Sequence, residues 1–203
     1  MPAGTLQRFL FQYRCTLFVS GLCLVIALLP TSTMELLQYE RTAILDGEWW
    51  RLITGHLVHL GWNHLIMNLI GFWLIWHLFL SNENPLAYCF YRLPLLTMGT
   101  SLGLLFLSPE VAWYRGLSGV LHGLLSLALL RQSRQQPVIS SLLLVLLTIK
   151  LAWEQIAGPL PGSEPWIDGR VIVDAHLYGA LCGVILWLLE RSYTLLTHRE
   201  VTG

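Results

Sequence analysis

The chain has 203 residues, of which 55% are hydrophobic and only 12% are Asp, Glu, Lys or Arg, whereas an ordinary soluble domain carries roughly 25% charged residues. This composition excludes an intrinsically disordered chain, and it argues against a water-soluble globule because so few charged side chains would have to cover the whole surface. The net charge is zero and no basic run occurs, so we do not expect a nucleic-acid partner.

Six apolar runs predict an all-α membrane bundle that forms a single domain over residues 1–203. A helix needs about 20 residues to cross the bilayer core, so the shorter runs span only if flanking residues extend them or the bilayer thins. The first run could instead be a cleaved signal peptide, but no clear cleavage site precedes Pro30, and five more runs follow. The expected helices cover residues 15–30, 60–80, 86–107, 117–131, 138–156 and 171–190.

Charge predicts the orientation. If the N-terminus is cytoplasmic, the inner segments carry a mild excess of basic residues, and both termini are then cytoplasmic. The connection 31–59 is long and mixes Leu, Ile and Trp with charged residues, which is typical of a loop at the outer membrane interface. Glu48 and Arg51 are three residues apart within it and could pair if this turn is helical. The four cysteines are scattered through apolar stretches, which indicates small buried hydrophobes rather than ligands.

Polar side chains inside membrane spans are costly and suggest function. His64 and Asn68 lie early in the second expected span, Ser118 and His122 open the fourth, and His176 lies early in the sixth. All three spans are entered from the outer side, so these five side chains converge just beneath the outer surface. Each pair within a span has i,i+4 spacing and therefore shares one helix face.

Small residues favour close contact between two of these spans. Gly119-x-x-x-Gly123 and Gly179-x-x-x-Gly183 are small-xxx-small faces, which let helix backbones approach closely. If these faces meet, the Ser118 hydroxyl and the His176 imidazole come within hydrogen-bond reach. Gly99-x-x-x-Gly103 could pack in the same way without taking part in chemistry.

The convergent residues suit nucleophilic catalysis. A serine hydroxyl is a weak nucleophile until a base takes its proton, and His176 is the candidate base for Ser118. The Ser118 amide, at the start of a helix, could bind an oxyanion together with the His64 and Asn68 side chains. No carboxylate is obviously placed to orient His176, because Asp174 should face elsewhere on the helix. We therefore expect a Ser–His dyad.

The same residues also allow other interpretations. An isolated Gly-x-Ser-Gly is commonly helix packing, and a lone membrane histidine commonly bonds a backbone carbonyl. His56, His59 and His64 could suggest a metal-dependent hydrolase or transporter, but no carboxylate or thiolate completes a ligand set, so we expect neither a metal nor a cofactor. Lys150 is expected to extend to the outer interface.

Four motifs in order resemble the rhomboid intramembrane serine proteases. Together they extend from Glu48 to Gly183, which is most of the chain, and their combination is more specific than any one motif. His59 follows the first motif at the family's spacing. The motifs are Glu48-Trp49-Trp50-Arg51 (E-x-W-R), His64-Leu65-Ile66-Met67-Asn68 (H-x-x-x-N), Gly116-Leu117-Ser118-Gly119 (G-x-S-G) and Ala175-His176-Leu177-Tyr178-Gly179 with Gly183 (A-H-x-x-G-x-x-x-G).

This resemblance implies a compact six-helix rhomboid core with 31–59 as its membrane-embedded first loop. It implies Ser118 as nucleophile and His176 as general base and later acid, with His64, Asn68 and the Ser118 amide binding the oxyanion. The reaction would be peptide-bond hydrolysis through an acyl-enzyme, without a cofactor. Residues expected to support the site are Gly116, Gly119, His122, Gly179 and Gly183.

One departure is informative, because His122 stands where many rhomboids carry a tyrosine that packs on the catalytic histidine. The run from Gly116 to Gly123 and the minimal core resemble the rhombosortase subgroup. That resemblance implies a bacterial inner-membrane protein with a periplasm-facing site, whose partners are membrane lipid and a protein substrate with a C-terminal Gly-Gly anchor helix. A catalytically inactive rhomboid-like protein that only binds client helices is the alternative, and the oligomeric state is not predicted.

Overall fold

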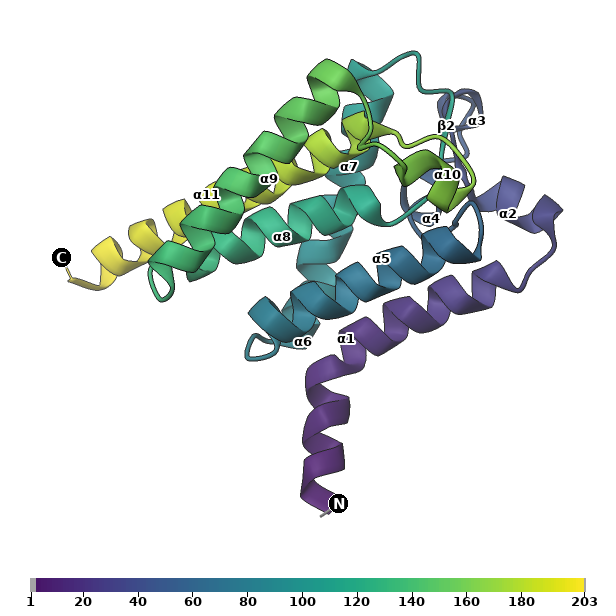
Figure 1. Cartoon of the computed structure of the whole chain (residues 1–203). Coiled ribbons are helices and arrows are strands. Elements are labelled where there is room, and N and C mark those ends of the chain that lie inside the picture. Colours follow the sequence, from purple (N-terminus) through teal and green to yellow (C-terminus); the bar gives the residue numbers. More distant parts are fainter. Residues whose placement is uncertain (1–2, 203) are drawn as a thin grey trace.

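The structure, a computed structural model, describes residues 3–202 and is almost entirely helical (Figure 1). Helix α8 lies in the middle, with α5, α7, α9 and α11 packed around it, and α1 lies along the outer side of α5. The long elements are α1 (Ala3–Ala27), α5 (Trp62–Ile75) continued by the π-helical η1 (Trp76–Leu80), α6 (Pro85–Ala87) with η2 (Tyr88–Arg92) and α7 (Leu93–Leu107), α8 (Ser118–Gln132), α9 (Pro137–Ala157) and α11 (Val173–Thr202).

Two helices extend beyond the predicted bounds. The first was expected over 15–30, but α1 begins at Ala3 and ends at Ala27, before Pro30. The predicted helix began after Arg14 because only uncharged residues were included. Arg8 and Arg14 nevertheless fit within α1, since a long arginine stem can cover apolar surface while its charged head reaches water. The last was expected to end at 190, but α11 continues to Thr202. No Gly or Pro interrupts it after Gly183, and Glu and Arg are good helix formers.

The expectation of six full-length spans needs correction. Five helices of the described chain are long and apolar enough to cross a bilayer: those within Leu6–Ala27, Trp62–Leu80, Pro85–Leu107, Pro137–Ala157 and Val173–Thr197. Helix α8 has only 15 residues, about 22 Å, which is shorter than the bilayer core of about 30 Å. Because α5, α7, α9 and α11 enclose α8, the length of α8 does not have to match the thickness of the bilayer core.

The contact between α8 and α11 is made by glycine. A Cβ at Gly119 would lie 2.7 Å from the Ala175 carbonyl oxygen, and one at Gly123 would lie 2.6 Å from the Gly179 carbonyl oxygen. A Cβ at Gly179 or Gly183 would overlap the α8 backbone. The two small-xxx-small faces therefore meet, and only glycine lets the helices approach this closely.

The segment after α1 is a folded structure and not only an interfacial loop. It contains α2 (Thr31–Leu37), β1 (Tyr39–Glu40), α3 (Arg41–Leu45) and α4 (Arg51–Thr54). Strand β1 pairs antiparallel with β2 (Trp113–Tyr114), with Tyr39 opposite Tyr114. This pairing connects the first loop to the segment immediately before α8.

A buried arginine holds this loop together. Arg51 is 6% exposed, and its Nε lies 2.6 Å from the Glu48 carboxylate. Its Nη1 donates to the carbonyl oxygens of Glu35 and Gln38 at 2.7 and 3.0 Å. The i,i+3 pair predicted from the sequence is therefore present, and Arg51 also closes the end of α2.

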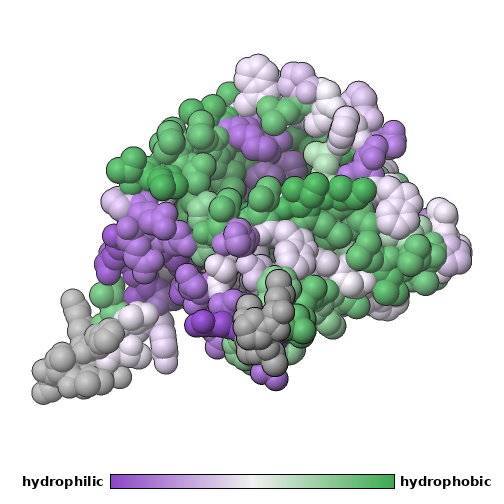
Figure 2. Space-filling model, turned by 60° about the horizontal axis from the view of Figure 1, so that its bottom comes forward, coloured by the Kyte–Doolittle hydropathy of each residue, from purple (hydrophilic) through white to green (hydrophobic). Residues whose placement is uncertain are grey.

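The outer surface of the bundle is largely apolar. Figure 2 shows hydrophobic side chains spread over much of one face, with hydrophilic residues gathered in separate groups. Helix α9 is the least enclosed of the five candidate spans, with 17% of its window buried. Exposed apolar side chains on α9 include Leu142, Val145, Leu146, Ile149 and Trp153. These features suit a lipid environment, because lipid tails are as apolar as these side chains.

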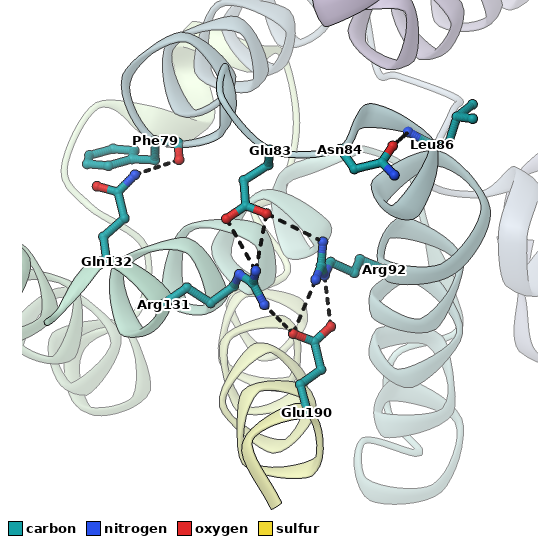
Figure 3. A network of polar contacts seen from close by, with 8 residues as sticks. All are labelled: Phe79, Glu83, Asn84, Leu86, Arg92, Arg131, Gln132 and Glu190. Carbon is teal, nitrogen blue, oxygen red and sulfur yellow. Dashed lines mark hydrogen bonds and ion pairs between the residues drawn. The ribbon is translucent and has the colours of Figure 1, made fainter. Parts of the chain in front are cut away.

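Charged residues join several elements at the C-terminal end of α8 (Figure 3). Glu190 on α11 binds both Arg92, Nε to Oε1 at 2.8 Å, and Arg131, Nη1 to Oε2 at 2.6 Å. Arg131 also binds Glu83 at 3.1 Å. Two arginines and two glutamates thus balance one another and fix the end of the bundle farthest from Ser118.

Candidate active site

Ser118 and His176 come together where α8 and α11 begin. Ser118 is the first residue of α8, and His176 lies in the first turn of α11. The Ser118 Oγ and the His176 Nε2 are 3.0 Å apart. The glycine contact between the two helices brings these side chains, 58 residues apart in sequence, within hydrogen-bond distance.

A carboxylate from a third helix contacts His176. The His176 Nδ1 lies 3.1 and 3.0 Å from the two carboxylate oxygens of Glu154 on α9. An ionised carboxylate can only accept, so Nδ1 carries the proton, and Nε2 is left to accept from the Ser118 hydroxyl. This is the tautomer that a general base requires.

The expectation that no carboxylate would orient His176 is therefore wrong. Asp174, the acid nearest to His176 in the sequence, does face elsewhere and accepts a hydrogen bond from Ser108 Oγ at 2.5 Å. Glu154 is 3% exposed and lies on the face of α9 that packs against α8 and α11. The contact between Glu154 and His176 depends on how α9 packs against α11. The spacing of residues along either helix alone does not predict it.

Lys150 belongs to the same cluster and does not extend to the interface as expected. Its Nζ lies 2.7 Å from Glu154 Oε2 and 2.8 Å from His122 Nε2. Lys150 and Glu154 are i,i+4 on α9, so they share one face. The ammonium has two strong acceptors inside the bundle and therefore does not need to reach water.

His122 stacks on His176, with ring centroids 4.2 Å apart and ring planes 16° apart. The His122 Nδ1 lies 2.7 Å from the Ser118 carbonyl oxygen, which can only accept, and its Nε2 faces the Lys150 ammonium, which can only donate. His122 is thus held neutral, with its proton on Nδ1. It presents a flat face to His176 and no competing charge.

The two expected oxyanion donors lie beside the segment that precedes Ser118. The Leu60 amide donates to His64 Nδ1 at 3.4 Å, so the His64 proton is on Nε2. The Asn68 Nδ2 is buried and has no hydrogen-bond partner among the described residues. An unpartnered buried donor is costly, and Asn68 lines the cavity beside Ser118, so its Nδ2 is available to an acceptor that enters there.

Gly116 permits this arrangement. Its φ is +126°, and a Cβ would lie 2.5 Å from His64 Cε1, so the position requires glycine on both counts. The Tyr114 hydroxyl donates to the Gly116 carbonyl at 2.5 Å, and the Gly116 amide donates to the Gly55 carbonyl at 3.1 Å. Burial raises the pKa of Tyr114 to about 12, so the hydroxyl remains protonated.

These groups share one cavity of about 230 Å³. Besides Ser118 and His176, it is lined by His64, Asn68, Glu154 and Lys150. Residues of α10 (Ser163–Ile167), which packs against α5, also line this cavity. The cavity thus brings together a serine hydroxyl, an imidazole and the buried side chains of His64 and Asn68.

The three histidines considered for a metal site do not form a ligand group among the described residues, although the His59 and His64 rings meet edge to face with centroids 5.1 Å apart. His56 Nε2 is engaged by Ser101 Oγ at 2.8 Å, and His59 Nδ1 donates to the Leu57 carbonyl oxygen at 3.1 Å. Among the described residues, the metal-like donor grouping is His122, Glu154 and His176. The Lys150 ammonium already contacts His122 and Glu154 of this group, so the chain itself supplies the positive charge that these two side chains bind.

Comparison with known proteins agrees with the architecture. The family model described as "Rhomboid domain" matches residues 46–193. The chain belongs to the rhomboid family. It is also similar to a protein of Bacillus subtilis (strain 168) named "Putative rhomboid protease YdcA", with 26% identity over 201 residues that cover 92% of this chain and 96% of that protein. Rhomboid proteins are intramembrane serine proteases that act on transmembrane substrates, and the five apolar helices make this chain an integral membrane protein.

Sequence reasoning missed Glu154 and Lys150 as parts of the site, although a signal was present. The expected fifth helix, residues 138–156, contains both residues four positions apart near its outer end. An i,i+4 Lys–Glu pair in an otherwise apolar span is costly unless it has partners. Its predicted depth matched that of Ser118 and His176.

Proposed function

We propose that this rhomboid protein is a serine endopeptidase in which Ser118 is the nucleophile and His176 the general base. The observation that carries the proposal is the 3.0 Å approach of Ser118 Oγ to His176 Nε2. The proton assignment at His176 supports it further, because Nε2 is free to accept the hydroxyl proton.

The reaction proceeds in two halves. The Ser118 oxygen attacks the carbonyl carbon of the scissile peptide bond, and its proton passes to His176 Nε2. The tetrahedral intermediate collapses, the C–N bond breaks, and the leaving amine takes the proton from His176. Water then attacks the acyl-enzyme, gives a proton to His176 and releases the new C-terminus, and Ser118 regains its hydrogen.

The oxyanion of each tetrahedral intermediate is bound by donors already in place. These are the Ser118 amide, His64 Nε2–H and Asn68 Nδ2. As the first residue of α8, Ser118 has an amide that precedes the intrahelical hydrogen-bond ladder, and the helix dipole favours negative charge there. The His64 and Asn68 side chains are buried, and donors fixed in this way stabilise developing charge without reorganising.

The substrate we propose is a C-terminal anchor helix with a Gly-Gly sequence, as in the clients of rhombosortases. Glycine weakens a helix and exposes backbone, and a protease must bind its substrate in an extended form. The run from Gly116 to Gly123 and the histidine at position 122 support this subgroup. The enzyme would then lie in a bacterial inner membrane with Ser118 near the periplasmic side and both termini in the cytoplasm.

A direct test uses purified protein and a serine-directed fluorophosphonate. We expect the wild type to be labelled and Ser118→Ala not to be, with Ser126→Ala as a matched control that removes a buried serine of the same helix. Equal labelling of wild type and Ser118→Ala would overturn the assignment of the nucleophile. Mass spectrometry of a co-expressed Gly-Gly-anchored client should show a new C-terminus with the wild type alone. A client that stays full length with wild type would instead favour a client-binding protein.

A further inference from the structure

Beyond the proposed pair, the base has a buried acidic partner. Glu154 contacts His176 Nδ1 with both carboxylate oxygens, at 3.0 and 3.1 Å, on the side of the ring opposite Ser118. The three side chains form a continuous line from hydroxyl to imidazole to carboxylate. They come from three helices, α8, α11 and α9.

The environment of Glu154 keeps the carboxylate ionised and fixed. Its side chain is only 2% exposed, and a buried charge is costly unless it is paired and hydrogen-bonded. Lys150 supplies the opposite charge at 2.7 Å, and His176 supplies the second donor. Lys150 is itself held by His122, whose Nε2 lies 2.8 Å from Nζ. His122 thus holds Lys150, Lys150 holds Glu154, and Glu154 holds His176.

The charges explain why the acid is needed. When His176 takes the Ser118 proton it becomes a cation, and the Lys150 ammonium lies only 3.3 Å from its Nδ1. Without an anion between them, the two like charges would repel in a low-dielectric interior. The Glu154 carboxylate bonds to both groups and offsets that repulsion. Other ionisable or polar groups near the ring are the neutral His122 stacked on it, and His64 and Tyr114 across the cavity.

We propose that Glu154 is a positioning residue that completes a Ser118–His176–Glu154 triad, with Lys150 as its built-in counter-ion. This inference rests on the proposed serine protease function. Glu154 holds the imidazole in the tautomer that leaves Nε2 free, accepts the Nδ1–H bond throughout, and stabilises the imidazolium. It does not itself take a proton at any step.

The test compares four variants in detergent by fluorophosphonate labelling rate and by kcat and KM for a Gly-Gly-anchored client. Glu154→Gln keeps the shape and loses the charge, so kcat should fall roughly 10⁴-fold with KM nearly unchanged. Glu154→Asp keeps the charge and should recover much of that loss. Glu110→Gln, an exposed acid away from the cavity, should match the wild type.

A double variant separates a catalytic effect from a packing effect. In Glu154→Gln with Lys150→Met, the cation that repels the imidazolium is gone, so labelling should be at least tenfold faster than in Glu154→Gln alone. A merely structural glutamate predicts the reverse, because a second buried substitution adds damage. Thermal unfolding followed by tryptophan fluorescence identifies variants that fail to fold.

The outcomes distinguish the two proposals. Wild-type labelling that does not depend on Ser118 would refute the proposed function itself. Ser118-dependent labelling at the wild-type rate in folded Glu154→Gln would leave the protease intact and remove Glu154 from the triad. Failure of Lys150→Met to speed up Glu154→Gln would also overturn the charge argument.

Discussion

His122 and His176 form a parallel stack, with ring centroids 4.2 Å apart. The His122 ring is fixed at both nitrogens, by the Ser118 carbonyl oxygen and by Lys150 Nζ. The His122 ring therefore packs against one face of the His176 ring, and its own hydrogen bond goes to the Ser118 carbonyl oxygen rather than to the Ser118 hydroxyl. A position that many rhomboids fill with a tyrosine is here filled by an aromatic ring that also connects Ser118 to the Lys150–Glu154 pair.

This stacking predicts the effect of changing His122. His122→Ala should lower kcat about tenfold or more, because the His176 ring loses the surface that orients it and a small misplacement of a base is costly. His122→Phe keeps the flat face and should retain more activity than the alanine variant. Steady-state cleavage of a Gly-Gly-anchored client measures both. Equal activity of the two variants would show that stacking does not orient the base.

The unpartnered amide of Asn68 predicts a role that appears only during catalysis. Asn68→Ala should reduce kcat about 10²- to 10³-fold with little change in KM, because a preorganised oxyanion donor is lost. His64→Ala should act in the same direction. The matched control is Gln135→Ala, an exposed amide near the far end of the bundle. Wild-type kcat in folded Asn68→Ala would assign this side chain to packing alone.

The close contact between α8 and α11 predicts that a larger residue at Gly179 lowers both stability and activity. At Gly179 an added methyl would overlap the Gly119 carbonyl, so Gly179→Ala should push α8 and α11 apart. Overpacking of this kind typically costs about 1–3 kcal/mol, and it would also lengthen the distance from Ser118 to His176. Gly21→Ala on α1 is the control, because no atom lies within 4 Å of its Cβ position. Thermal unfolding and labelling rate measure the two effects, and a fully active, equally stable Gly179→Ala would contradict the packing.

Buried His56 predicts a pH-dependent stability. Burial lowers its pKa from 6.5 to about 4 in the folded state. Between these values the unfolded chain binds the proton and the folded chain does not, so the free energy of unfolding falls as pH decreases from about 6.5 to 4. The loss from this one residue is about 3 kcal/mol. His59 contributes with the same sign, because burial lowers its pKa to about 3.

The measurement is the unfolding temperature in detergent between pH 7.5 and 4.5. We expect it to fall toward acid in the wild type and to fall less steeply in His56→Gln. The variant loses the titrating group but keeps a polar side chain opposite Ser101. Identical slopes for the two proteins would show that His56 does not titrate as its burial requires.

Several features were predictable from the sequence because they depend on local periodicity. Runs of apolar residues predicted the helical membrane fold, and i,i+4 spacing paired His64 with Asn68 and Ser118 with His122. The glycine motifs indicated which helix faces could meet. The short span at 117–131 did not reveal that its helix would be enclosed, because enclosure depends on the neighbours and not on the length of the run.

What the sequence by itself determined is which side chains share a helix face and a depth, since both follow from the 1.5 Å rise and 3.6-residue turn of one helix. It therefore placed Ser118 and His176 at one level. Only the tertiary structure decided that Glu154 lies behind His176 and that Lys150 turns inward, because these contacts depend on how α9 is rotated and packed against α8 and α11. Rotation about a helix axis is set by the partners that the helix meets, and no single stretch of chain specifies them.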